Sequence, residues 1–480
     1  MTNKASRRDF LKAGTAGLCA WTLGVRGGTA EVSKRPNVLI ITTDQQCVTA
    51  MSAMGNGWVK TPNIDALAAN GVCFSNSYCS YPLCSPSRAT LHTSRMPHET
   101  GVNHNALTIA PDVPLSGQLF RAAGYDTAYV GKWHLPVSYP NDGIVGFELL
   151  NKIERKNKLA HDVDEATLAG AVEFLRRKHD KPFFLVASFI NPHDICQLAG
   201  YDKKEKLQDE LRQRYYPAAG ASLPPLPANF ARPQGEPDLL ARKLRCEDWN
   251  EDDWRSYRYA YYRLLEDVDR QVGGVMESLR QTGQEDNTLV VFTSDHGEGQ
   301  GAHHRTGKMM FYEEEAAVPL IVSWKGVTPA GRIDRTHLVS TVDVLPTLCD
   351  YAGVKPPELV RGQSLRPVLE KPESTGHGFV VSEMVVGENP GASWSFMVRT
   401  KKFKYMVFPG TERNEMLFDL EADPGEMKNL AGVADLSDEL LRHRALLADW
   451  RTATAEEAGP IKSKKDDPRP KKKQNKKKNQ

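Results

Sequence analysis

The stretch "RPNVLIITTDQQ", residues 35–46, places a short apolar run directly before a polar cluster. The run is rich in β-branched residues, so it predicts a buried strand over 38–42. Asp44 and Gln45 then lie at the carboxyl end of that strand. In open α/β sheets, the carboxyl ends of the parallel strands form the edge at which ligands bind. This stretch therefore predicts an α/β fold with a polar site just beyond its first strand.

Three later stretches repeat this arrangement. They are "DTAYVGKWHL" (126–135), "KPFFLVASFINPHD" (181–194) and "NTLVVFTSDHGE" (287–298), with strands predicted over 127–130, up to residue 193, and over 288–293. The polar side chains at their ends are Lys132, His134, His193, Asp295 and His296. Four strand ends with such side chains are hard to explain as solvated turns, so we expect them to form one site.

Helical patterns separate the predicted strands. One helix is expected from Thr61 to Gly71, and a longer one from Asn250, as its cap, to Gly283. The long helix carries an aromatic and aliphatic stripe that we interpret as core packing. Strands alternating with helices predict a large mixed, mostly parallel sheet flanked by helices, the α/β class.

The pattern of apolar and polar residues changes after residue 369. Short alternating runs at 378–386, 393–400, 402–408 and 415–426 predict strands joined by turns, and 436–455 predicts a closing helix. We therefore expect a catalytic domain over 35–370 and a smaller C-terminal subdomain over 376–455 with an antiparallel sheet.

Both ends of the chain are basic, and the body is not. The chain carries +2 overall, with +4 in residues 1–30 and +8 in residues 461–480, which leaves −10 for the body between them. An acidic body is not typical of a nucleic-acid-binding domain, so we expect no nucleic-acid partner. The lysine-rich tail over 458–480 is expected to be disordered.

The N-terminus predicts export. "SRRDFLKAGTAGLCAWTLGVRGGTA" (6–30) has twin arginines, a short apolar run and a small-residue end, which is typical of a twin-arginine signal with cleavage after Ala30. The run is too short to span a bilayer. We expect a periplasmic or secreted protein, handled by the twin-arginine export machinery and not membrane-spanning. The eight cysteines show no zinc-type pairing, and we expect no Cys73–Cys79 disulfide.

Residues 83–101, "LCSPSRATLHTSRMPHETG", contain a cysteine four residues before an arginine. This stretch closely resembles the C-x-P-S-R signature of the type I sulfatases, within the alkaline-phosphatase-like superfamily, and the likeness extends through Thr93, Pro97 and Gly101. The resemblance implies that a formylglycine-generating maturation enzyme oxidises Cys84, and that the hydrated aldehyde is the nucleophile. It also implies that Arg88 steadies this hydrate.

Other motifs extend the resemblance over roughly residues 35 to 450. They are Asp44-Gln45, "GKWHL", "NPHD", "SDHGEGQGAHHRTGKMMFYEE" (294–314), "KFKYMVF" (402–408) and "LFDLEADPGEMKNL" (417–430). By this resemblance, Asp44, Gln45, Asp295 and His296 hold a divalent metal together with residue 84. The residues that bind sulfate or protonate the leaving alcohol are Lys132, His193 and Lys308. The base that releases sulfate is His134. The resemblance also places His303 at the substrate.

The resemblance implies Ca²⁺ as the metal. Gln45 replaces the commoner aspartate and His296 adds a nitrogen ligand, so Mn²⁺ is kept as the alternative. The predicted activity is hydrolysis of sulfate esters on a sulfated carbohydrate. Two alternatives stay open: a phosphonate monoester or phosphodiester hydrolase of the same fold, and a non-catalytic protein that binds sulfated glycans.

Overall fold

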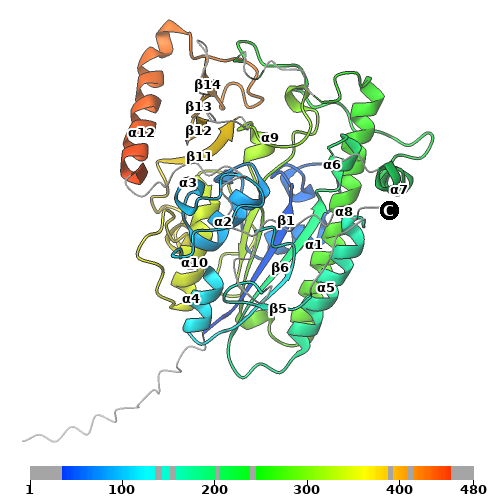
Figure 1. Cartoon of the computed structure of the whole chain (residues 1–480), viewed down its shortest axis with the longest axis vertical. Helices are drawn as coiled ribbons and strands as arrows, with labels where there is room; N and C mark the ends of the chain where they lie inside the picture. Colours follow the sequence, from blue (N-terminus) through cyan, green and yellow to red (C-terminus); the bar gives the residue numbers. More distant parts are fainter. Residues whose placement is uncertain are drawn as a thin grey trace, which may run out of the picture. The chain divides into compact units, whose positions relative to one another are not determined.

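The computed structural model describes residues 35–135, 143–151, 158–201, 205–237, 240, 245–386, 393–408 and 414–455 (Figure 1). The predicted export signal over 1–30 and the lysine-rich tail over 458–480 lie outside the described residues. Among the helices of the described part, none combines the length and the apolar character needed to cross a membrane.

An eight-stranded sheet forms the centre of the structure, in the order β5-β4-β6-β1-β7-β8-β2-β9. Its strands are β1 (Asn37–Asp44), β2 (Val72–Phe74), β4 (Asp126–Gly131), β5 (Glu148–Leu149), β6 (Phe183–Pro192), β7 (Thr288–Ser294), β8 (Leu320–Ser323) and β9 (Arg332–Asp334). Only β8 runs against its neighbours β7 and β2; the other neighbouring pairs are parallel. The predicted mixed, mostly parallel sheet is confirmed.

Helices cover both faces of this sheet (Figure 1). Along β1, Leu39 and Ile41 belong to one apolar cluster, whereas Val38 and Ile40 belong to another. Because successive side chains of a strand point to opposite faces, a strand buried on both faces has no polar side. This burial explains why the first strand was a continuous apolar run.

The α-helices before residue 371 have the following bounds: α1 (Pro62–Ala69), α2 (Cys84–Thr93), α3 (Pro97–Thr100), α4 (Ser116–Ala122), α5 (Ala160–Arg176), α6 (Ile195–Leu198), α7 (Glu205–Tyr215), α8 (Glu251–Gln281), α9 (Glu313–Ala316), α10 (Val344–Ala352) and α11 (Arg366–Glu370). The two-residue strands β3 (Ser77–Tyr78) and β10 (Val339–Ser340) pair separately.

Helix α8 begins where its cap was predicted. The Asn250 side chain accepts a hydrogen bond from the backbone N–H of Asp253 at 3.0 Å, which satisfies a helix N–H that has no partner in the helix. The helix ends at Gln281, and Gly283 follows with a φ of 69°. Its stripe is buried as expected, with Tyr257, Val268 and Leu279 fully covered.

A second, four-stranded sheet is antiparallel throughout. It consists of β11 (Phe379–Val386), β12 (Ser393–Thr400), β13 (Phe403–Val407) and β14 (Glu415–Asp419), and α12 (Ser437–Ala455) packs on it. Two backbone contacts join β11 to the segment before Cys84: Glu383 N–H donates to Ser80 O at 2.9 Å, and Val385 N–H donates to the Tyr81 hydroxyl at 2.8 Å. This sheet therefore supports the segment that leads to the cysteine.

Candidate active site

The carboxyl ends of four parallel strands meet the start of helix α2. Asp44 ends β1, Asp295 follows β7, Lys132 follows β4, and His193 follows β6. Cys84 is the first residue of α2, whose ten residues are all buried. The first backbone N–H groups of a helix point outward and carry partial positive charge, so this end favours an anion.

Cys84 lies at the centre of this group. Its Sγ is 3.1 Å from Lys308 Nζ, 3.2 Å from His296 Nε2, and 3.7 Å from both Lys132 Nζ and Asp44 Oδ1. Burial and the Asp44 carboxylate raise the pKa of this thiol. The charges of Lys132, Lys308 and His296 outweigh both, so the pKa of Cys84 lies well below its usual value. The surroundings thus favour a negative charge at this atom.

Arg88 joins the two buried aspartates. Its Nε donates to Asp295 Oδ2 at 2.8 Å and its Nη2 to Asp44 Oδ2 at 3.0 Å. Its Nη1 donates to Lys132 O at 2.7 Å and to Ser188 Oγ at 2.8 Å. One residue therefore ties together four strand ends, since Ser188 lies on β6. The planar guanidinium suits this role, because it offers five donors in a fixed geometry.

Four side chains here could hold a metal ion. Asp44, Cys84, Asp295 and His296 each offer one ligand atom, and these atoms all lie within 4.8 Å of one another. Burial and the Asp44 charge raise the pKa of Asp295 to about 6. Two buried carboxylates, a thiol and a ring nitrogen at this spacing fit a divalent cation, which would offset the repulsion between the aspartates.

The predicted cations and histidines are also brought together. Lys132 pairs with Asp44, and His193 Nε2 lies 3.9 Å from Asp44 Oδ1. Burial, followed by the charges of Lys132 and Lys308, holds the pKa of His193 well below its usual value. His193 is therefore neutral near pH 7. Ser85 Oγ donates to His134 O at 2.6 Å, which places His134 beside the residue that follows Cys84.

Gln45 reaches the same centre by its side chain. Its amide oxygen accepts a hydrogen bond from Lys308 Nζ at 3.0 Å, and its amide nitrogen donates to Glu298. Its backbone N–H donates to Asp295 Oδ1 at 3.1 Å. Gln45 thus contacts both the metal-binding group and a cation beside it.

Strained backbone conformations gather at this site. Gln45, His134 and Met309 have φ values of 77°, 56° and 79°, in the left-handed region that side chains other than glycine's rarely adopt. Each is adjacent to, or part of, the group around Cys84. Strain of this kind persists where the surrounding structure holds a functional residue in place.

His303 is not brought into this group. Its ring is buried and stacks on Tyr312 with centroids 3.8 Å apart. Its polar neighbours in the described part of the chain include Asn229, Glu314 and Glu426. The structure therefore separates His303 from the other residues of the predicted site.

The sequence reasoning missed several supporting residues. Glu298 accepts from the Tyr257 hydroxyl at 2.8 Å and from the Gly307 N–H at 2.6 Å, so it connects α8 to the segment that carries Lys308. The Tyr261 hydroxyl donates to Gln45 O at 2.7 Å. The aromatic stripe of α8 is core packing as expected, but its hydroxyl groups also position the site. Glu298 lies only two residues after His296 in the sequence, and this proximity could have indicated that Glu298 belongs to the site.

The expectation of free thiols is confirmed for Cys73 and Cys79. The seven cysteines of the described residues are all unpaired.

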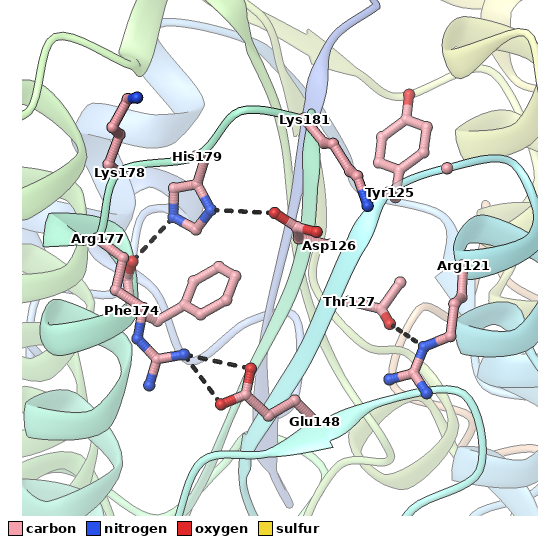
Figure 2. Close-up of a pocket in the computed structure, with 11 residues that line it drawn as sticks. Arg121, Tyr125, Asp126, Thr127, Glu148, Phe174, Arg177, Lys178, His179 and Lys181 are labelled. Atoms are coloured by element: carbon pink, nitrogen blue, oxygen red, sulfur yellow. Dashed lines mark hydrogen bonds and ion pairs between the residues drawn. The ribbon is translucent and has the colours of Figure 1, made fainter.

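The opposite edge of the sheet differs from the catalytic edge. A pocket of about 400 Å³ opens there, where β4 and β6 begin (Figure 2). Two of its basic side chains have acidic partners: Arg177 Nη1 lies 2.9 Å from Glu148 Oε1, and Lys178 Nζ lies 3.0 Å from Asp180 Oδ1.

Comparisons with known proteins agree with this geometry. The chain matches the family description "Sulfatase" over residues 36–354 and "N-sulphoglucosamine sulphohydrolase, C-terminal" over residues 301–444. It is 32% identical over 465 residues to a Delta 4,5-hexuronate-2-O-sulfatase of Bacteroides thetaiotaomicron, with 92% of this chain and 94% of that protein covered. It is 31% identical over 444 residues to a choline-sulfatase of Rhizobium meliloti, covering 83% and 82%.

Solved structures have the same fold. A 2-O GAG sulfatase superposes with a TM-score of 0.76 at 31% identity and covers 90% of this chain and 95% of its own. The phosphonate monoester hydrolase of Agrobacterium radiobacter superposes with a TM-score of 0.73 at 27% identity, covering 88% and 96%. The sulfatase match spans well over half of the 480 residues. The chain therefore belongs to the sulfatase family and is a sulfuric ester hydrolase.

Proposed function

We propose that this enzyme hydrolyses sulfate esters on a carbohydrate, and that residue 84 acts as a formylglycine hydrate beside a divalent metal. The observation that supports this most directly is the position of Cys84. Its Sγ stands at the start of α2, within 3.7 Å of Asp44, Lys132, His296 and Lys308. In the matured enzyme, an oxygen of the hydrate would replace this sulfur. A formylglycine-generating enzyme is the proposed partner for that modification.

Asp44, Gln45, Asp295 and His296 would hold the metal, together with residue 84. Ca²⁺ is the proposed ion. Mn²⁺ is the alternative, because Gln45 offers an amide oxygen in place of a carboxylate and His296 adds a ring nitrogen. When bound, the ion polarises the sulfate oxygens and neutralises charge that develops during hydrolysis. Arg88 keeps Asp44 and Asp295 ionised and oriented, through the two hydrogen bonds described above.

The remaining side chains bind the substrate and move protons. Lys132 and Lys308 flank the nucleophile, so their charges attract the anionic sulfate ester. Burial lowers the pKa of Lys308, but the negative charge at residue 84 and at its neighbours has the larger effect. The pKa of Lys308 therefore lies above its usual value, and its ammonium group stays charged. Lys308 is proposed to protonate the leaving alcohol, and His193 is proposed to bind the sulfate group through its neutral ring. His134, at the strained turn after β4, is proposed as the base for sulfate release.

A sulfated carbohydrate is the proposed substrate class. Its support is the likeness to the hexuronate-2-O-sulfatase and to an N-acetylglucosamine-6-O-sulfatase of Bacteroides thetaiotaomicron, at 32% and 27% identity. The twin arginines at residues 7 and 8 support export to the periplasm or the medium, where such glycans are encountered.

A phosphonate monoester or phosphodiester hydrolase is the second candidate. It is favoured by the 27% identity to the Agrobacterium radiobacter enzyme and by the Asp44-Gln45 pair. Sulfate esters and phosphodiesters carry the same single negative charge, so the cations at the site do not separate the two substrates.

The test is a substrate panel with the protein co-expressed with a maturation enzyme. Sulfated mono- and disaccharides, an aryl sulfate, a phosphodiester and a phosphonate monoester are compared by kcat/KM, and the peptide carrying residue 84 is weighed by mass spectrometry. We expect the modified residue and the highest kcat/KM on a sulfated sugar. A faster rate on the phosphodiester or phosphonate would replace the proposal with the second candidate, and an unmodified residue 84 in active enzyme would remove the proposed nucleophile.

A further inference from the structure

Four segments of the chain converge on a second buried cluster. Asn229 comes from the loop before α8, His303 from the turn Ala302–His304, Glu314 from α9, and Glu426 from the loop after β14. One ligand atom from each of His303, Glu314 and Glu426 lies within 4.8 Å of the other two. His303 Nε2 lies 3.7 Å from Glu314 Oε2. This cluster shares none of its residues with the group around Cys84.

The cluster has more hydrogen-bond acceptors than donors. The Asn229 side-chain nitrogen faces three acceptors: Glu314 Oε1 at 2.8 Å, Gly425 O at 3.2 Å and His303 Nε2 at 3.3 Å. An amide has only two hydrogens, so one acceptor stays without a donor. Glu314 Oε2 has no hydrogen-bond partner in the described structure, and neither does His303 Nδ1, although His303 is only 1% exposed. Buried polar atoms without partners are costly unless an ion or water meets them.

The charges in this region are also unbalanced. Lys404 Nζ pairs with Glu313 at 2.6 Å and with Glu426 at 2.8 Å, and Arg305 pairs with Glu236 at 2.7 Å. Arg399 reaches Glu313 only through the Tyr78 hydroxyl. Among the described residues, no lysine or arginine lies within ion-pair distance of Glu314, whose basic neighbour is His303. Burial and neighbouring carboxylates raise the pKa of Glu426 to about 8, and burial raises that of Glu314.

We propose that His303, Glu314 and Glu426 bind a second divalent metal ion of the transition series, such as Zn²⁺. One imidazole nitrogen with two carboxylates is a ligand set that zinc accepts and that calcium, which takes oxygen ligands, does not favour. Turning the Asn229 amide would present its oxygen as a fourth ligand, since the two ends of an amide have nearly the same shape. Glu314 is partly exposed and offers a path for the ion.

Such an ion would hold the segment that carries Lys308. His303 lies between His296 and Lys308 in sequence, and the Glu298 N–H donates to Glu314 O at 2.8 Å. An ion shared with Glu426 would tie this segment to the C-terminal sheet, so binding stabilises the folded chain. The role is structural and is independent of the proposed sulfate chemistry.

The test uses the full chain with the catalytic metal group removed by Cys84→Ala and Asp295→Asn. This background is stripped with a chelator, dialysed against Zn²⁺ and analysed by native mass spectrometry and elemental analysis. We expect one zinc per chain and a higher melting temperature with zinc. Adding His303→Asn or Glu314→Gln should abolish both, whereas the neighbouring His304→Asn should keep both.

Two results would overturn the proposal. One is the absence of bound zinc in the background protein. The other is equal zinc content with and without His303→Asn, which would place the ion elsewhere. A second measurement does not depend on variants of the cluster: wild-type enzyme saturated with Ca²⁺ should gain a further rise in melting temperature on addition of Zn²⁺. No further rise would also contradict the site. Zinc content and melting temperature are measured without sulfate turnover, so neither result depends on the proposed function.

Discussion

Arg88 and Asp295 form a buried ion pair across the base of the active site, with Nε 2.8 Å from Oδ2 and both side chains 2% exposed. The same guanidinium reaches Asp44 at 3.0 Å. The residue four positions after Cys84 thus holds the carboxylates of both Asp44 and Asp295. Its contacts are to the carboxylates and to strand ends, so Arg88 acts through them, whereas the family resemblance alone had placed it against the hydrate of residue 84.

Replacing Arg88 should weaken both stability and activity. Arg88→Ala leaves two buried carboxylates without their cation, so we expect unfolding free energy to fall by about 3–5 kcal/mol in metal-free protein. Denaturant titration measures this change, and kcat/KM should fall at least about 100-fold. Arg177→Ala, in an exposed pair with Glu148, is the matched control and should cost about 0–1 kcal/mol. Equal effects of the two variants would contradict the bridging role.

Cys84→Ala should abolish turnover and leave the fold intact. The side chain is small, and the two lysines beside it keep their contacts with Asp44 and Gln45, so circular dichroism and the melting temperature should change little. Cys84→Ser should also be inactive, unless the host matures serine. Cys349→Ala changes a thiol buried in the opposite apolar cluster and should retain full kcat. Activity in Cys84→Ala would exclude residue 84 as the nucleophile.

Removing the metal should abolish activity reversibly. Chelator treatment should reduce kcat to background, and either Ca²⁺ or Mn²⁺ should restore it; which ion restores more identifies the native metal. Asp295→Ala should lower metal content and kcat more than Gln45→Ala, because a carboxylate binds a cation more strongly than a neutral amide does. Asp286→Ala, a surface change beside Lys325, should leave metal content unchanged. The reverse order of Asp295 and Gln45 would contradict the ligand assignment.

His134→Ala should separate the first turnover from later ones. If His134 is the base for sulfate release, an aryl sulfate should still give a burst of about one product per chain, followed by slow turnover. Rapid-mixing kinetics measures both phases. His179→Ala, in the pocket at the opposite edge of the sheet, should change neither phase (Figure 2). Loss of the burst together with turnover would show that His134 acts earlier.

The His98–Glu383 pair should make stability depend on pH. His98 Nδ1 lies 2.8 Å from Glu383 Oε2 and joins α3 to β11. Burial opposes the charged ring, but Glu383 outweighs it and raises the pKa of His98 above its usual value. The pair's stabilisation is therefore complete below about pH 6.5, the unfolded value, and is lost as pH rises through the folded pKa.

Chemical denaturation at about pH 6 and about pH 8.5 measures this effect. The loss of unfolding free energy between the two pH values should be larger in the wild type than in His98→Gln. Glu383→Gln should reduce the loss in the same way, because either change removes the charge pair. An unchanged pH dependence in both variants would assign the effect to another group.

Local patterns were enough to predict much of the fold. The apolar runs predicted β1, β4, β6 and β7. The observed β1, β4 and β7 extend beyond the predicted bounds by at most two residues at either end, whereas β6 ends at Pro192, one residue before its predicted end. The Asn250 cap was visible because a helix start depends on neighbouring residues. The antiparallel strand β8 and the short strands β2 and β9 were not predicted, since a four-residue apolar run does not reveal its direction or its neighbours.

The sequence by itself identified the candidate site residues, because the order of the motifs from Asp44 to Lys308 is a property of the chain alone. Only the tertiary structure decided which of them meet. Cys84 and Lys308 are separated by 224 positions yet lie 3.1 Å apart, and Gln45 contacts Glu298 across 253 positions. His303, five residues before Lys308, is instead turned toward Asn229 and Glu314. Sheet order and register set these distances, and they arise from packing across the whole molecule, which no local pattern of residues encodes.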